Sequence, residues 1–134
     1  MLIDTNVLIS IILRQNDYKS SVKFFDLLSS HKKKVVILDF AIYSTCLILK
    51  RRNELAALKR FPNYLESRPN FSIYRLSLSE LSELNQLKIN LDFDDSIHYF
   101  LAKKNKLQLV SYDRDFDKTD LKRLTPAEAL EQLI

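Results

Sequence analysis

Short apolar runs alternate with longer amphipathic stretches along the whole chain. Brief runs rich in Ile, Val and Leu are typical of buried strands in a parallel sheet, whereas apolar residues spaced three or four positions apart are typical of helices. The apolar runs predict four strands, at Met1–Ile9, Val35–Leu38, Phe71–Leu76 and Leu107–Val110.

The predicted helices fall between and after these strands. They are expected at residues 7–13, 18–30, 40–52, 54–66, 77–87, 91–103 and 124–130, with a break before Pro62 in the fourth. In the last of them Thr125 suits the N-cap and Pro126 the first helical position. Alternating strands and helices predict a mostly parallel sheet covered on both faces. We therefore expect an α/β protein, a three-layer α/β/α sandwich around four to five strands, as a single domain over residues 1–134.

Composition narrows the class of protein only a little. At 134 residues, with 46% hydrophobic and 28% charged residues, the chain has the size and balance of one soluble globular domain. Its net charge of +4 is compatible with a polyanionic partner without requiring one. The single cysteine, Cys46, excludes a disulfide framework, and no apolar run reaches the ~18 to 20 residues of a membrane span. We therefore expect a cytoplasmic protein with no membrane partner.

The chain contains no glycine, and this absence excludes several kinds of site. A Walker loop, a dinucleotide-binding fingerprint and a nucleophile elbow all need glycine for positive φ or for close approach of the backbone. With only His31 and His98 and no CxxC pair, a zinc site or a serine triad has little support either. A histidine on a half-buried helix is most often a packing residue, and we expect this of His98.

Carboxylates recur where the predicted strands end. Asp4 interrupts the first apolar run, where a buried charge is costly without a compensating partner, although an aspartate there could also cap a helix. Asp39 and Asp113 follow later strands, and Asp95 lies at the start of a predicted helix. Ligands of open parallel sheets bind beyond the carboxyl ends of the strands, so these acids are expected to converge. Carboxylates within ~5 Å of one another repel unless divalent cations separate them, and oxygen ligands favour Mg²⁺ or Mn²⁺.

Three segments resemble the motifs of PIN domains, in particular of the single-domain VapC-type toxins of toxin–antitoxin pairs. They are Leu2–Leu8, Asp95–Ala102 and Ser111–Phe116, which occur in the order of the family motifs and are spread over essentially the whole chain. The resemblance implies three catalytic acids that hold the metal, Asp4, Asp95 and Asp113, and two supporting polar residues, Asn6 and Ser111.

This resemblance also implies an activity and a set of partners. PIN domains of this type hydrolyse phosphodiester bonds of RNA, with Mg²⁺ or Mn²⁺ at the acids to activate water and to stabilise charge on the phosphate. We therefore expect a divalent-metal-dependent endoribonuclease with RNA as its substrate. A toxin would have an antitoxin protein as its partner. Since many relatives pair, a homodimer is expected as well.

One position departs from the family pattern. The helix after the second strand normally carries a glutamate, and Ser44 stands in its place at the site. No acid lies between Asp39 and Glu54, and Glu54 would be about 15 Å further along the helix at 1.5 Å per residue. We expect weakened activity unless Asp39, Asp94 or Asp115 compensates. Asp39 is favoured as a cap and Asp115 as a solvated turn residue.

Two alternatives to the toxin remain open. A PIN-like domain with degenerate chemistry would bind RNA or a protein partner instead of cleaving RNA. A receiver-like phosphoacceptor domain also gathers acids around Mg²⁺, but it normally has an acid pair just after the first strand, where this chain has Asp4 alone.

Overall fold

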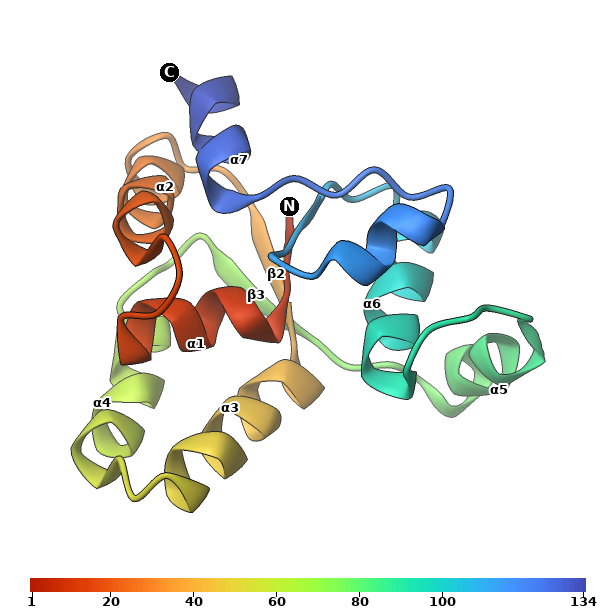
Figure 1. Cartoon of the computed structure of the whole chain (residues 1–134), viewed down its shortest axis with the longest axis horizontal. Coiled ribbons are helices and arrows are strands. Elements are labelled where there is room, and N and C mark those ends of the chain that lie inside the picture. Colours follow the sequence, from red (N-terminus) through yellow and green to blue (C-terminus); the bar gives the residue numbers. More distant parts are fainter.

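A four-stranded parallel sheet forms the centre of the molecule in the computed structural model, which describes residues 1–134 (Figure 1). Its strands are β1 (Leu2–Ile3), β2 (Val35–Leu38), β3 (Phe71–Tyr74) and β4 (Leu109–Val110). They lie in the order β3-β2-β1-β4, and each neighbouring pair is parallel. The α/β class and the parallel sheet expected from the sequence are confirmed.

Helices cover this sheet. They are α1 (Thr5–Leu13), α2 (Tyr18–Ser30), α3 (Asp39–Arg51), α4 (Leu55–Glu66), α5 (Leu78–Gln86), α6 (Phe93–Lys104), the 3₁₀ helix η1 (Arg114–Lys118) and α7 (Pro126–Leu133). The chain runs from β1 to β2 to β3 in one direction along the sheet and then returns to β4. Because such parallel crossovers are right-handed as a rule, α1 to α4 cover one face, and α5 and α6 cover the other (Figure 1). α7 packs beside α2. No helix combines the length and the apolar character that crossing a membrane requires.

The first predicted strand is wrong in its length. β1 ends at Ile3, and Asp4 has an extended conformation (φ −77°, ψ 153°) before α1 begins at Thr5. The apolar run from Val7 onward is helical, because a run that is apolar at nearly every position suits a buried helix as well as a buried strand. The carboxylate of Asp4 favours the helix locally, since it accepts the N–H of Thr5 at 2.7 Å.

The other differences between the predicted and the observed elements concern the ends of single helices and strands, or one residue inside a helix. α4 runs without interruption through Pro62, an exposed residue, so the predicted break is absent. β3 ends at Tyr74 instead of Leu76, and β4 begins at Leu109 instead of Leu107. α3 begins at Asp39 itself. These ends depend on hydrogen-bond partners that belong to other parts of the chain, which a sequence pattern does not specify.

The order of the strands reverses at β1, and we call the region beyond the carboxyl ends of β1 and β4 the crevice. β2 and β3 lie on one side of β1 in the sheet, and β4, the last strand in the chain, lies on its other side. Ligand sites of open α/β sheets lie outside the carboxyl ends of the strands at such a reversal. Ile3 pairs with Val110, and the N–H of Asp4 donates to the carbonyl of Val110 at 3.0 Å. The residues that follow β1 and β4 therefore lie side by side.

The hydrophobic core holds these strand ends in place. All four residues of β1 and β4 have no exposed surface. At the opposite edge of the sheet from β4, Phe25 of α2 packs edge-to-face on Phe71 of β3, with ring centroids 5.3 Å apart. Phe25 is fully buried and Phe71 half-buried, and a fully buried Phe or Leu side chain stabilises a fold by about 1.5–3 kcal/mol. The crevice is thus formed by the most deeply buried part of the sheet.

Candidate functional site

Asp4 lies at the carboxyl end of β1, in the crevice beside β4. It is buried, with 4% of its surface exposed. Its Oδ1 accepts the N–H of Thr5 at 2.7 Å, and its Oδ2 accepts the hydroxyl proton of Ser111 at 2.6 Å. Asp4 therefore caps α1 and also contacts the residue that follows β4. The two interpretations of Asp4, as a helix cap and as an acid of the site, do not exclude each other.

A buried serine ties the parts of the crevice together. Ser111 follows β4 and has no exposed surface. Its hydroxyl donates to Asp4 and accepts two protons, from the backbone N–H of Asp113 at 2.9 Å and from the side-chain amide of Asn6 at 3.2 Å. The amide oxygen of Asn6 accepts the N–H of Tyr112 at 3.2 Å. Since a hydroxyl offers one donor and two acceptor positions, this one is fully used.

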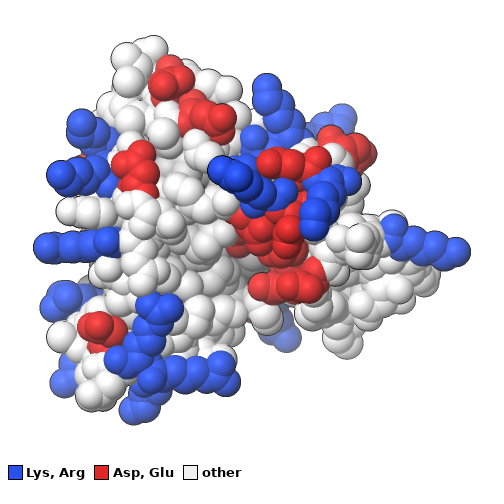
Figure 2. All heavy atoms as spheres, in the orientation of Figure 1, with Lys and Arg blue, Asp and Glu red and all other residues white.

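Three further carboxylates form an acid group next to Asp4. Asp95 comes from the first turn of α6, and Asp113 and Asp115 come from the start of η1. Oxygen atoms of these three acids lie within 4.8 Å of one another. Figure 2 shows acidic side chains gathered where α1, α6 and η1 meet, with Lys and Arg side chains around them. The structure thus brings Asp95 and Asp113 together, with Asp4 at the edge of the group.

No lysine or arginine neutralises the three predicted acids. None of the ion pairs in the structure joins Lys or Arg to Asp4, Asp95 or Asp113. The pKa of Asp95 is raised to about 8, first by burial and then by the negative charges of Asp113, Asp94 and Asp4. A carboxyl with such a pKa keeps a proton near pH 7 unless a cation takes the place of that proton.

Asp115, predicted to be a solvated turn residue, belongs to the acid group as well. Its side chain is 51% exposed, and its Oδ1 lies 3.1 Å from the ammonium of Lys118. Its N–H donates to Oδ1 of Asp113 at 2.8 Å. The prediction of a turn is therefore right, but the 3₁₀ turn brings the Asp115 carboxylate back toward Asp95.

His98, predicted to be a packing residue, contacts Asp4 in addition to filling the core. It is 1% exposed, and its Nδ1 lies 2.9 Å from the carbonyl oxygen of Asp94. Its Nε2 lies 3.6 Å from Oδ1 of Asp4, which is too long for a hydrogen bond but within reach of an ion pair, so Nε2 has no hydrogen-bond partner. The signal that favours this position is spacing, because residues 95 and 98 lie on one face of a helix.

Comparison with known proteins decides the family. The family model of the PIN domain matches residues 1–122. The chain belongs to the PIN domain family. The resemblance in the three sequence motifs is confirmed.

Two solved structures share the fold of this PIN domain. VapC20 of Mycobacterium tuberculosis, a toxin that cleaves the sarcin–ricin loop, has a TM-score of 0.71 and 12% identity, over 92% of this chain and 97% of its own. PAE2754 of Pyrobaculum aerophilum has a TM-score of 0.67 and 23% identity, over 98% of this chain and 87% of its own. At such identities the likeness shows the fold alone. Among curated proteins none matches the sequence.

Ser44, where the resemblance in sequence leads us to expect a glutamate, lies on α3. Ser44 is half-buried there and its side chain makes no hydrogen bond. Asp39, at the start of the same helix, is not in the acid group, and its carboxylate accepts the N–H of Phe40 at 2.7 Å. Asp94 is exposed at the start of α6. Asp94 lies within 4.8 Å of Asp95 but is grouped with Asp92, whereas Asp115 is grouped with both Asp95 and Asp113.

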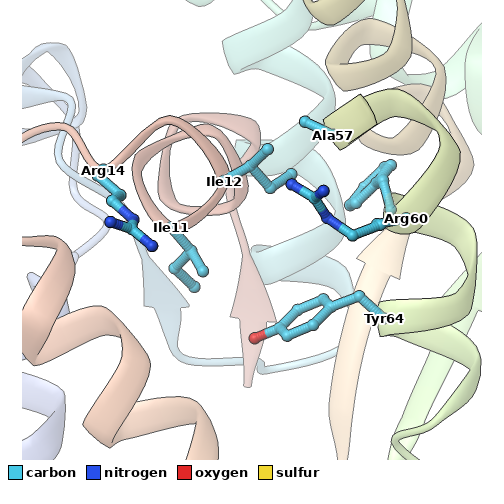
Figure 3. Close-up of a pocket in the computed structure, with 7 residues that line it drawn as sticks. Ile11, Ile12, Arg14, Ala57, Arg60 and Tyr64 are labelled. Carbon is cyan, nitrogen blue, oxygen red and sulfur yellow. The ribbon is translucent and has the colours of Figure 1, made fainter. Parts of the chain in front are cut away.

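A hollow between α1 and α4 is separate from the acids (Figure 3). Its lining includes Ile11, Ile12 and Tyr64 together with two cations, Arg14 and Arg60. None of the predicted site residues lines it. The acids of this PIN domain therefore lie apart from the hollow between α1 and α4.

Proposed function

We propose that this protein is a VapC-type endoribonuclease that depends on a divalent metal ion and acts as the toxin of a toxin–antitoxin pair. Its membership of the PIN domain family and the fold that it shares with VapC20 support this proposal. The observation that carries it is a set of acids that no lysine or arginine neutralises: Asp4 and Asp95, which are buried, and Asp113, which is half-buried.

The residues of this crevice fit a divalent cation. PIN domains are generally dependent on divalent metal ions, and the oxygens of Asp95, Asp113 and Asp115 are close enough for one ion to contact several of them. A set of carboxylate oxygens favours Mg²⁺ or Mn²⁺. We propose Asp4, Asp95 and Asp113 as the catalytic acids and metal ligands. The bound ion would supply the positive charge that activates water and stabilises the phosphate under attack.

The remaining polar residues hold these acids in position. The hydroxyl of Ser111 fixes Oδ2 of Asp4, and the amide of Asn6 fixes the loop that leads to Asp113. The carboxyl of Asp95 releases its proton when a cation binds beside it. Lys and Arg side chains surround the acids, and they would attract the RNA backbone to a crevice that is itself negative (Figure 2).

Ser44 leaves the site with one carboxylate fewer than the family pattern. A hydroxyl carries no charge, so the site attracts a second cation less strongly. Asp115 supplies a carboxylate from η1 to the same group. We therefore propose weakened cleavage rather than its loss.

The same substitution favours a second function, a degenerate PIN domain that binds RNA or a protein partner without cleaving RNA. The variant Ser44→Glu separates the two. A cleavage rate that rises by about tenfold or more in Ser44→Glu indicates a weakened enzyme. A tenfold change corresponds to about 1.4 kcal/mol of activation free energy, which one more carboxylate beside the metal ion can supply. An unchanged, measurable rate indicates that Asp115 already fills the role. No cleavage by either protein indicates a binding module.

The proposed activity is tested by incubating the protein with structured RNA and Mn²⁺ or Mg²⁺. Wild-type protein should cleave the RNA, and Asp95→Asn should lower the rate by about 100-fold, since a ligand of the ion is lost. The control is Glu131→Gln, which also turns a carboxylate into an amide, on the exposed side of α7. No cleavage with either ion, or a rate that Asp95→Asn leaves unchanged, would contradict the proposal.

A toxin requires partners, and two are proposed. The first is an antitoxin protein. A short neighbouring reading frame whose product co-purifies with this chain would support it, and we propose a cytoplasmic location for the pair. The second is another copy of the chain. Phe40, Tyr43 and Leu47 lie on one side of α3 and are 37%, 70% and 50% exposed. Large apolar side chains gathered on one exposed face often mark a contact surface.

A further inference from the structure

We propose that His98 is a further ligand of the metal site, and that its Nε2 and Oδ1 of Asp4 bind the same cation. The juxtaposition that carries this inference is a buried nitrogen without a hydrogen-bond partner, 3.6 Å from the oxygen of a predicted metal-binding acid. This inference rests on the proposed metal dependence. It adds one nitrogen ligand to the carboxylate oxygens proposed as ligands of the ion. It also predicts which ion the site prefers.

The orientation of the His98 ring indicates which of its two nitrogens bears the lone pair. Nδ1 of His98 lies 2.9 Å from the carbonyl oxygen of Asp94, one turn earlier in α6. A carbonyl oxygen can only accept, so Nδ1 carries the proton and Nε2 bears the lone pair in the neutral ring. Histidines that bind metals usually hold their other nitrogen in this way, through a hydrogen bond to a backbone carbonyl or a carboxylate. The ring of His98 is therefore preorganised as a ligand.

The surroundings of Nε2 call for a cation. His98 is 1% exposed, so no solvent reaches this nitrogen, and no donor of the protein satisfies it. Oδ1 of Asp4, another atom with lone pairs, lies 3.6 Å from it. Two acceptors that face each other in a buried place repel, and a positive charge between them removes the repulsion.

The separation of the two atoms suits a single ion. Ligand atoms lie about 2.1 Å from Mn²⁺ or Mg²⁺, so two ligands of one ion are at most about 4.2 Å apart. The observed 3.6 Å lies within this limit. Oδ2 of Asp4 is already bound by Ser111, which leaves Oδ1 as the oxygen that faces His98. The separation of the two atoms therefore fits one shared ion.

A nitrogen ligand changes the preferred ion. Mg²⁺ binds oxygen ligands almost exclusively, whereas Mn²⁺ and later transition metals also accept imidazole. With Ser44 in place of a glutamate and His98 beside Asp4, this site offers less negative charge and one neutral nitrogen. We therefore expect the protein to bind Mn²⁺ more tightly than Mg²⁺.

Pulsed electron paramagnetic resonance of the Mn²⁺-loaded chain tests this ligand directly, because a coordinated imidazole adds ¹⁴N modulation to the echo. The chain contains two histidines, so His31→Gln is the matched control for His98→Gln. Wild type and His31→Gln should show the nitrogen signal, and His98→Gln should lose it. Calorimetry should show a Mn²⁺ dissociation constant raised by about tenfold or more in His98→Gln, with a smaller change for Mg²⁺.

Each result of these measurements has one meaning. Bound Mn²⁺ without a nitrogen signal in the wild type would overturn the role of His98, and would instead favour a protonated His98 paired with Asp4, while the proposed nuclease stands. A nitrogen signal without RNA cleavage would support His98 and contradict the nuclease. Failure to bind any divalent ion would overturn both. If His98→Gln does not fold, which circular dichroism shows, the spectra of wild type and His31→Gln decide.

Discussion

Ser111 donates its hydroxyl proton to Oδ2 of Asp4 at 2.6 Å, although 107 positions separate the two residues. Both are buried, and they follow the neighbouring parallel strands β4 and β1. This hydrogen bond joins the first and the last predicted motif of the site. The arrangement of the acids therefore depends on the pairing of β1 with β4.

Replacement of Ser111 by alanine is expected to affect both stability and metal binding. The variant Ser111→Ala removes a donor to Asp4 and leaves the N–H of Asp113 without its acceptor, so the free energy of unfolding should fall by about 1–3 kcal/mol. Urea denaturation measures this change. The control Ser82→Ala alters an exposed serine of α5 and should change stability by less than about 0.5 kcal/mol. Equal effects of the two variants would show that the buried hydroxyl has no special role.

Asp115 and Asp39 are expected to differ in their importance for cleavage. Asp115 is in the acid group and Asp39 is not, although both are aspartates at the start of a helix. Asp115→Asn should lower the rate of RNA cleavage by about tenfold or more, because it removes a charge next to the ion, and Asp39→Asn should leave the rate within about twofold. The opposite ranking would mean that the acid at the start of α3 replaces the family glutamate.

The stability of the metal-free protein should depend on pH through Asp95. Its pKa in the folded protein, about 8, is above the ordinary value of 3.8, so between these values the folded state holds more protons than the unfolded chain. Stability contributed by this carboxyl is therefore lost as the pH rises toward 8. Thermal unfolding in EDTA should show Tm falling over this range, and Asp95→Asn should reduce the fall. Addition of Mn²⁺ should raise Tm most near pH 8, because there the ion competes least with the proton on the Asp95 carboxyl.

The exposed apolar face of α3 is expected to form the dimer contact. Tyr43→Glu places a charge in the middle of this face, between Phe40 and Leu47, and should convert a dimer into a monomer in sedimentation velocity. Ile73→Glu is the control, since it alters an equally exposed apolar residue on β3, the edge strand. A wild-type monomer, or a dimer that only Ile73→Glu disrupts, would contradict this assignment.

The sequence predicts this fold well where local signals and burial agree. α2 is found at the predicted residues, because Asp17 caps it and Phe24, Phe25 and Leu28 give it one buried face. The length of β1 was predicted wrongly, because the residues after Asp4 are apolar at almost every position and show neither a period of two nor one of 3.6. The continuous path of α4 through Pro62 depends on its packing and could not be inferred from the residue type.

The candidate site is predictable in part for similar reasons. Asp4 and Asp113 follow neighbouring strands, Asp95 and Asp113 lie in one acid group, and the charge of Asp4 acts on Asp95. The places of Asp115 and His98 depend on the 3₁₀ turn after β4 and on the rotation of α6 about its axis. Neither is visible in a pattern of apolar and polar positions. The sequence shows only that residues 95 and 98 share a helix face.

Anomalous diffraction from crystals grown with Mn²⁺ tests most directly whether Asp4, Asp95 and Asp113 hold a divalent ion. We expect a strong anomalous peak between these three acids, with Nε2 of His98 among the atoms that contact it. No peak in this crevice at saturating Mn²⁺, with the acids paired instead to lysine or arginine, would contradict the account.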